Sequence, residues 1–149
     1  MATSSPKLIF PGLAGFYESM LPVAATLVRV VVGIMFIMHV WGKFNAGPAA
    51  IATHFGKYGL PSPELFAYAA MFLESVGGAC LIVGLFTRFF AAALAIEMGI
   101  ALCVAHLPKG YSAGAGGYEY VLLIGVVLLA IAMRGGGAYS IDAKIGKEL

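Results

Sequence analysis

The sequence predicts an all-α integral membrane protein, a four-helix bundle with its N- and C-termini on the same, cytoplasmic side. Three observations lead to this fold class. Of the 149 residues, 61% are hydrophobic and 11% are charged, whereas soluble domains average about 45–50% apolar and about 25% charged residues. Four long apolar runs follow one another, separated by polar or Gly- and Pro-rich segments. Lysine and arginine are also distributed unequally between the two sides that these runs define.

The predicted spans are residues 20–42, 65–86, 89–107 and 118–133. A helix of about 20 residues crosses a hydrocarbon core of about 30 Å at 1.5 Å per residue, and the fourth span is short at about 24 Å. Pro22 suits the first turn of the first span, where its missing N–H costs nothing. Ser62-Pro63-Glu64 has the cap, proline and acidic residue typical of a helix start.

The segments outside the spans are polar or mixed in character. Residues 1–19 form an N-terminal tail that can lie on the membrane surface, with Phe10, Phe16 and Tyr17 as interface anchors. Residues 20–134 form the single four-span domain. Residues 135–149 form a charged C-terminal tail, which we expect in the cytoplasm.

Orientation follows from the placement of the cations. One side of the predicted bundle holds Lys7, Arg88, Arg134, Lys144 and Lys147, and the other holds Lys43, Lys57 and Lys109. This bias favours cytoplasmic termini, because cytoplasmic segments carry an excess of lysine and arginine. We therefore expect a multi-pass protein of the bacterial inner membrane, with the first long loop facing outward.

Three ionisable side chains interrupt the apolar runs: Arg29, Glu74 and Glu97. Each lies about eight or nine residues into its predicted span, which is near mid-membrane. Left unpaired, the three would cost on the order of 8–10 kcal/mol, so we expect them to meet in the bundle interior. Because one guanidinium faces two carboxylates, we expect Glu74 or Glu97 to keep a proton at neutral pH. The cluster could be structural or a proton relay.

A second polar layer is predicted toward the outer face and consists of His39, Lys43, His106 and Glu119. On a helix, Arg29 and Lys43 point within about 40° of each other, so the first span carries a polar stripe that reaches the outer surface. His106 ends the third span and Glu119 begins the fourth at the same level. These positions predict a polar pocket that opens outward. The alternative is ordinary interfacial anchoring, with Lys43 extending to the headgroups.

Several other functions have little support in the sequence. The net charge is +2 without a basic run, which argues against nucleic-acid binding. Cys80 and Cys103 form no CxxC pair, and their predicted depths differ too much for a disulfide. Two histidines and one carboxylate are a known metal ligand set, but no spacing shows that His39, His106 and Glu119 converge. The two histidines also lie at the membrane edge, so we assign neither metal nor haem.

The chain resembles the DoxX family of small four-helix membrane proteins from about residue 27 to residue 142. The matching motifs are Arg29-x-x-x-Gly33, His39-x-x-Gly42-Lys43-Phe44, Gly59-Leu60-Pro61, Glu74-x-x-Gly77-Gly78, Gly84-Leu85-Phe86-Thr87-Arg88, Tyr118-Glu119 and Gly135-x-Gly137-x-Tyr139-Ser140-Ile141-Asp142. The resemblance implies a four-helix bundle. It also implies a redox role, because the name-giving members look like subunits of a membrane thiosulfate:quinone oxidoreductase. Other relatives are linked to oxidative-stress complexes, and distant ones to the assembly or transport of membrane proteins.

Together these features predict a membrane-embedded subunit or accessory of a quinone-linked oxidoreductase. The outward pocket would hold a quinone or quinol head group, with His39, His106 and Glu119 exchanging protons. No cofactor motif is present, so electrons would come from a bound cofactor or a partner redox protein. The expected partners are the bilayer, other membrane proteins and, as a further option, a second copy of the chain. The alternatives are a non-enzymatic scaffold or assembly chaperone, or a small-molecule or ion carrier.

Overall fold

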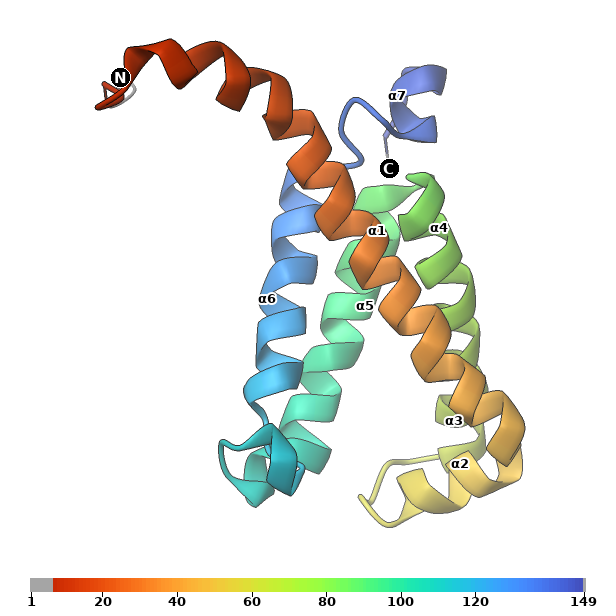
Figure 1. Ribbon diagram of the computed structural model, residues 1–149. Coiled ribbons are helices and arrows are strands. Elements are labelled where there is room, and N and C mark those ends of the chain that lie inside the picture. The colour runs from red at the N-terminus through yellow and green to blue at the C-terminus, as the bar shows by residue number, and fades with distance from the viewer. Residues whose placement is uncertain (1–6, 149) are drawn as a thin grey trace.

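The computed structural model describes residues 7–148, and all regular elements in this range are helical (Figure 1). The α-helices are α1 (Ala14–Ala46), α2 (Pro48–Gly56), α3 (Pro63–Phe72), α4 (Gly78–Val83), α5 (Thr87–Ala101), α6 (Glu119–Arg134) and α7 (Ile141–Ile145). Two π-helical turns continue α3 and α5, namely η2 (Leu73–Gly77) and η3 (Leu102–His106). Short 3₁₀ turns are η1 (Pro11–Leu13), η4 (Leu107–Lys109) and η5 (Ala113–Ala115).

Within residues 7–148, three helical stretches are long and apolar enough to cross a membrane: Pro11–Ala46, Pro63–Val83 and Thr87–Lys109. Helix α6 has 16 residues and packs along α5. Helix α1 packs on α4 and barely touches α6, so the bundle is splayed at the end that carries α2 and η3 (Figure 1). The first turns of α1 and the short α7 are both at the opposite end, on different sides of it (Figure 1).

Helix α1 begins earlier than the sequence predicts. It starts at Ala14 rather than near residue 20, and Pro22 lies inside it rather than in its first turn. A proline removes one backbone hydrogen bond, but it ends a helix only when the flanking residues do not continue it. Here apolar residues continue the helix on both sides, and its first half projects beyond the bundle (Figure 1). Of the predicted tail, residues 1–6 lie outside the described residues.

Helices α1 and α4 cross at two glycines. A Cβ atom added to Gly33 would lie 2.6 Å from the carbonyl oxygen of Gly78, and one added to Gly78 would lie 3.0 Å from the carbonyl oxygen of Gly33. Small residues allow two helix backbones to approach this closely. The core that surrounds the crossing is apolar and consists of Val32, Phe36, Leu81, Ala91, Leu94, Ala95, Ile124, Leu128 and Ile131.

Substitution of Gly33 by alanine is expected to destabilise the protein by about 1–3 kcal/mol, because the added methyl group overpacks the crossing against backbone atoms that cannot rotate away. Denaturant titration of the detergent-solubilised protein measures the effect. Gly42→Ala is the matched control, because Gly42 lies in the same helix with no atom within 4 Å of an added Cβ. We expect this control to be neutral or slightly stabilising. Equal effects of the two substitutions would contradict the close crossing.

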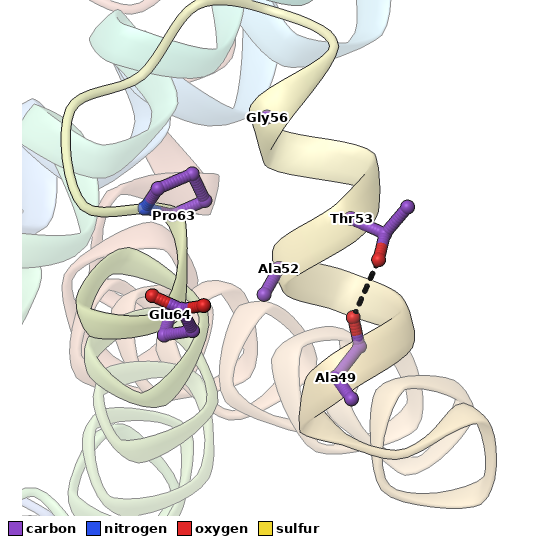
Figure 2. Close-up of a pocket in the computed structure, with 6 residues that line it drawn as sticks. All are labelled: Ala49, Ala52, Thr53, Gly56, Pro63 and Glu64. Carbon is purple, nitrogen blue, oxygen red and sulfur yellow. Dashed lines mark hydrogen bonds between the residues drawn. The ribbon is translucent and has the colours of Figure 1, made fainter.

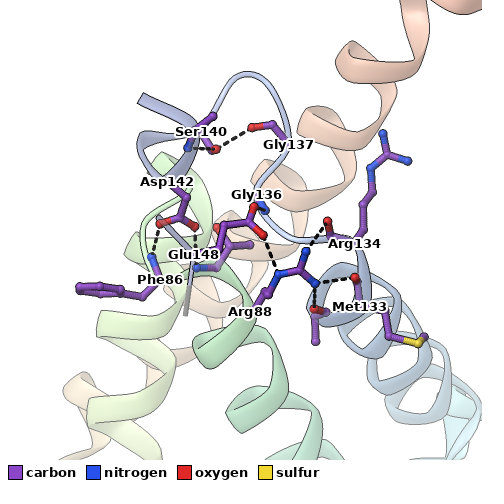
Figure 3. Close-up of polar contacts among 12 residues, drawn as sticks. Phe86, Arg88, Met133, Arg134, Gly136, Gly137, Ser140, Asp142 and Glu148 are labelled. Atoms are coloured by element: carbon purple, nitrogen blue, oxygen red, sulfur yellow. Dashed lines mark hydrogen bonds and ion pairs between the residues drawn. The ribbon is translucent and has the colours of Figure 1, made fainter. Parts of the chain in front are cut away.

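Hydrogen bonds hold the C-terminal segment against the turn between α4 and α5 (Figure 3). The Asp142 carboxylate is fully buried and accepts hydrogen bonds from the backbone N–H groups of Phe86, at 2.8 Å, and Thr87, at 2.9 Å. The N–H of Asp142 donates in turn to the carbonyl oxygen of Gly84 at 2.9 Å. Asp142 therefore caps the start of α5, where backbone N–H groups lack partners within the helix.

Arg88, in the first turn of α5, forms hydrogen bonds with the end of α6 (Figure 3). Its guanidinium donates to the carbonyl oxygens of Ala132, at 3.0 Å, Met133, at 2.5 Å, and Arg134, at 3.2 Å. It also pairs with the Glu148 carboxylate at 2.6 Å. A cation at a helix C-terminus satisfies carbonyl groups that have no partner in the helix. Arg88 thus links the start of α5 to the end of α6 and to the C-terminal segment.

Candidate functional site

A large cavity lies at the splayed end of the bundle, on the side away from α7. Its volume is about 920 Å³, and its walls come from the second half of α1, from α2, α3 and η2, and from α5, η3 and the start of α6. Most of the lining is apolar. The ionisable groups that face it are His39, Lys43, His54, Tyr58, Glu74, Glu97, His106, Lys109 and Tyr120.

An ion pair joins α1 to η2 at the cavity wall. Lys43 Nζ donates to Glu74 Oε1 at 2.5 Å. The Glu74 side chain is 1% exposed and that of Lys43 is 15% exposed. Such a buried carboxylate requires a partner, because an uncompensated charge in a low-dielectric interior is very costly. The Nε2 atom of His39 lies 3.9 Å from the same Glu74 oxygen.

Glu97 of α5 lies against this pair. Glu97 faces the same cavity as Glu74 and Lys43, and α5 packs on η2. The Oε2 atoms of Glu74 and Glu97 are both buried, and neither has a hydrogen-bond donor among the described residues. The structure therefore gathers Lys43, Glu74 and Glu97 into one group, which we call the charged triad.

The two π-helical turns both border the cavity. Glu74 lies in η2, and His106 is the last residue of η3. A π-turn inserts one extra residue into a helix and rotates the side chains that follow, and such turns are frequent at functional sites. Neither turn could be predicted from the sequence, because π-turns have no strong composition signature.

Arg29 is separated from the two glutamates, in contrast to the predicted cluster of Arg29, Glu74 and Glu97. Its buried guanidinium donates to the carbonyl oxygens of Leu81, of Ile82 at 2.9 Å and of Tyr139 at 2.8 Å. Helix α4 ends at Gly84 in a left-handed conformation, which leaves these last carbonyl groups in need of donors. Because α1 starts early and projects from the bundle, Arg29 lies level with the α4–α5 turn and the C-terminal segment.

The predicted outer layer is only partly brought together. His39, Lys43 and His106 line the cavity, whereas Glu119 is not among its lining residues and Tyr120 is. Neighbouring residues of a helix point about 100° apart, which explains why one faces the cavity and the other does not. The Nδ1 atom of His106 lies 2.8 Å from the carbonyl oxygen of Gly116, so this histidine also fastens the loop before α6.

A second, smaller hollow lies between α2 and the start of α3 (Figure 2). Its lining residues are Ala49, Ala52, Thr53, Gly56, Pro63 and Glu64. The Thr53 hydroxyl already donates to the carbonyl oxygen of Ala49 at 2.9 Å (Figure 2). Glu64 is the one ionisable group in this lining. The hollow therefore offers much less chemistry than the large cavity.

Comparison with known proteins settles the family. The DoxX family model matches residues 24–107, which include α4, most of α1 and the whole charged triad. The chain belongs to the DoxX family. The match confirms the resemblance seen in the sequence, and it stops before α6 and the C-terminal segment.

Relatives of this DoxX protein occur in several bacteria. A Haemophilus influenzae protein without a functional name is 34% identical over 134 residues, covering 88% of this chain and 97% of the relative. A Bacillus subtilis protein named "Putative oxidoreductase CatD" is 32% identical over 109 residues, covering 73% of this chain and 78% of the relative. The Mycobacterium tuberculosis membrane protein Rv3486 is 27% identical and covers 85% of this chain and 84% of its own. No solved structure is a significant match.

Proposed function

We propose that this DoxX protein is a membrane-embedded subunit or accessory of a quinone-linked oxidoreductase, and that its large cavity binds a quinone or quinol head group. The observation that carries the proposal is an apolar cavity of about 920 Å³ with a charged triad in its wall. Ligand pockets typically measure about 300–1,000 Å³ and combine apolar walls with a few convergent polar groups. A quinone has the matching chemistry, namely a flat apolar ring with two polar oxygens.

The cavity residues suit both the apolar ring and the polar oxygens of such a ligand. Leu73, Ile96 and Val104 offer apolar contact area for the ring and its tail. Lys43 and His39 offer donors for a carbonyl oxygen, and the glutamates offer acceptors for a hydroxyl group. The name of the Bacillus subtilis relative adds support for a redox role. The proposal assigns electron transfer to a bound cofactor or to a partner redox protein.

The proposed membrane arrangement has four crossings with both termini in the cytoplasm of a bacterial cell. Helix α6, with 16 residues, is the fourth crossing, and Arg134 at its end lies beside the C-terminal segment. The bias of lysine and arginine toward this end supports the orientation. The cavity, at the opposite end of the bundle, then opens toward the outer face of the inner membrane.

Ligand extraction tests the proposal. Protein solubilised in a mild detergent is expected to retain a quinone or quinol at close to one molecule per chain, detected by mass spectrometry. Ala101→Trp should abolish this retention, because Ala101 lines the cavity and the indole ring would fill it. Ala130→Trp is the matched control, since Ala130 is exposed on α6 and lies outside the cavity lining. Equal quinone content in both variants would contradict the proposed site.

One observation favours the scaffold alternative. The projecting half of α1 exposes apolar side chains, including Phe16 at 59% and Leu21 at 58% exposure, which lipid or a partner protein could cover. Stoichiometric co-purification with another membrane protein, in the absence of a bound small molecule, would favour this role. Retention of a quinone would favour the redox role.

A further inference from the structure

The charged triad has more acceptors than donors. Glu74 Oε1 receives a hydrogen bond from Lys43, but the Oε2 atoms of Glu74 and Glu97 are buried and receive none from the described residues. Lys43 carries one positive charge and therefore compensates only one of the two carboxylates. A second negative charge beside the first, in a low-dielectric site, strongly favours binding of a proton by the pair.

The placement of the two carboxyl groups leads to the same conclusion. Glu97 of α5 and Glu74 of η2 face the same cavity, where these two elements pack together. Two carboxylate groups have only acceptor atoms, so a hydrogen bond between them requires that one of them carries a proton. One proton between the two groups supplies the donor that the buried oxygens lack.

A route between this pair and the outside is also present. His39 lies one turn before Lys43 on α1, its Nε2 atom is 3.9 Å from Glu74 Oε1, and its side chain is 67% exposed. That distance exceeds a direct hydrogen bond and suits a small rearrangement or a bridging water. Histidine is also the side chain that most readily gains and loses a proton near neutral pH.

Other ionisable groups face the cavity from the surrounding elements. They are His54 of α2, Tyr58 of the following turn, His106 of η3, Lys109 of η4 and Tyr120 of α6. Among the described residues, none of the histidines and lysines in this group forms an ion pair with Glu74 or Glu97. In the described part of the chain, His39 and Lys43 are therefore the basic groups that lie within 3.9 Å of Glu74.

We propose that Glu74 and Glu97 share one exchangeable proton in the cavity wall, and that His39 passes this proton to and from the outer surface. The inference deepens the proposed function and rests on it for one point only, which is that a quinone or quinol in the cavity uses the proton. It transfers the role of proton exchange from His106 and Glu119 to the carboxyl pair. Binding and release of the proton at the pair involve no electron transfer.

Infrared spectroscopy of the purified full-length protein tests the shared proton. We expect the carbonyl stretch of a protonated carboxylic acid at neutral pH, and its loss in both Glu74→Gln and Glu97→Gln. Glu97→Asp keeps the carboxyl group and should keep a shifted band, which guards against loss by misfolding. Glu64→Gln, at an exposed glutamate outside the cavity, should leave the band unchanged. Absence of the band, or its persistence in Glu97→Gln, would overturn the inference.

Transfer into deuterated buffer tests the route. The band should shift more slowly in His39→Ala than in the unmodified protein, by at least about tenfold, because a positioned acid–base group has been removed. His54→Ala is the matched control, since His54 lines the same cavity without an ion pair to Glu74. Equal exchange rates in the two variants would overturn the role of His39. A protein that shows the band but retains no quinone would contradict the proposed function alone, so the two failures can be told apart.

Discussion

Replacement of Lys43 by methionine is expected to lower the free energy of unfolding by about 3–5 kcal/mol, because it leaves a buried carboxylate without its cation. Lys43 Nζ lies 2.5 Å from Glu74 Oε1, and the Glu74 side chain is almost fully buried. Methionine keeps the length and most of the volume of the lysine stem, so the loss reports the charge rather than a cavity. Titration with a denaturing detergent measures it.

The double variant Lys43→Met/Glu74→Gln separates the ion pair from packing. Glutamine carries no charge, and replacing both members of a buried pair is often close to neutral. We therefore expect the double variant to recover most of the lost stability. Lys57→Met, at an exposed lysine beyond α2, should change stability by no more than about 0.5 kcal/mol. A double variant as unstable as Lys43→Met would show that the pair does not hold α1 to η2.

Substitution of Asp142 by alanine has the second largest expected effect, a loss of about 2–4 kcal/mol. The Asp142 carboxylate accepts two backbone hydrogen bonds at the start of α5, and hydrogen bonds to a charged group contribute about 1.5–3 kcal/mol each. Its removal leaves one buried and one partly buried N–H group without acceptors and detaches the C-terminal segment from the α4–α5 turn. Thermal unfolding in detergent measures the change.

Asp142→Asn provides the graded control. The amide keeps one acceptor oxygen but loses the charge, so we expect a loss of stability between those of Asp142→Ala and the unmodified protein. Quinone retention should be unchanged in Asp142→Asn, because Asp142 is not among the residues that line the cavity. A stability of Asp142→Ala within about 0.5 kcal/mol of the unmodified protein would contradict the capping role.

The sequence predicted the start of α3 well, because Pro63 and Glu64 are strong local signals for a helix start. It placed the end of the second span at residue 86, whereas α4 ends at Val83, just before Gly84 in a left-handed conformation. The start of α1 was predicted too late, because Pro22 was taken as a sign that the helix begins there. Pro22 is a local signal that the longer apolar context overrides.

The site was predictable only in part. The cost of burying a charge indicated that ionisable groups in apolar runs face the protein interior, and Glu74 and Glu97 both line the large cavity. It could not identify the partners. Lys43, assigned to the outer layer, pairs with Glu74 because a flexible lysine can reach inward from its helix.

The partners of Arg29 and of the C-terminal segment could not be predicted either. The sequence predicted that Arg29 pairs with a carboxylate, but in the structure it donates to backbone carbonyl groups at the end of α4. The contacts of Asp142 and Arg88 also join segments far apart in the chain. Such pairings depend on tertiary packing, which no single sequence pattern encodes.

Photoaffinity labelling with an azido-quinone tests the central claim most directly. Irradiation of the protein in lipid nanodiscs, followed by peptide mapping, should place the adducts on the cavity lining of α1, η2 and α5. An excess of unlabelled quinone should prevent their formation, and Ala101→Trp should remove them. Adducts spread over the lipid-facing side chains, insensitive to both the competitor and the substitution, would contradict the claim that this cavity is a quinone site.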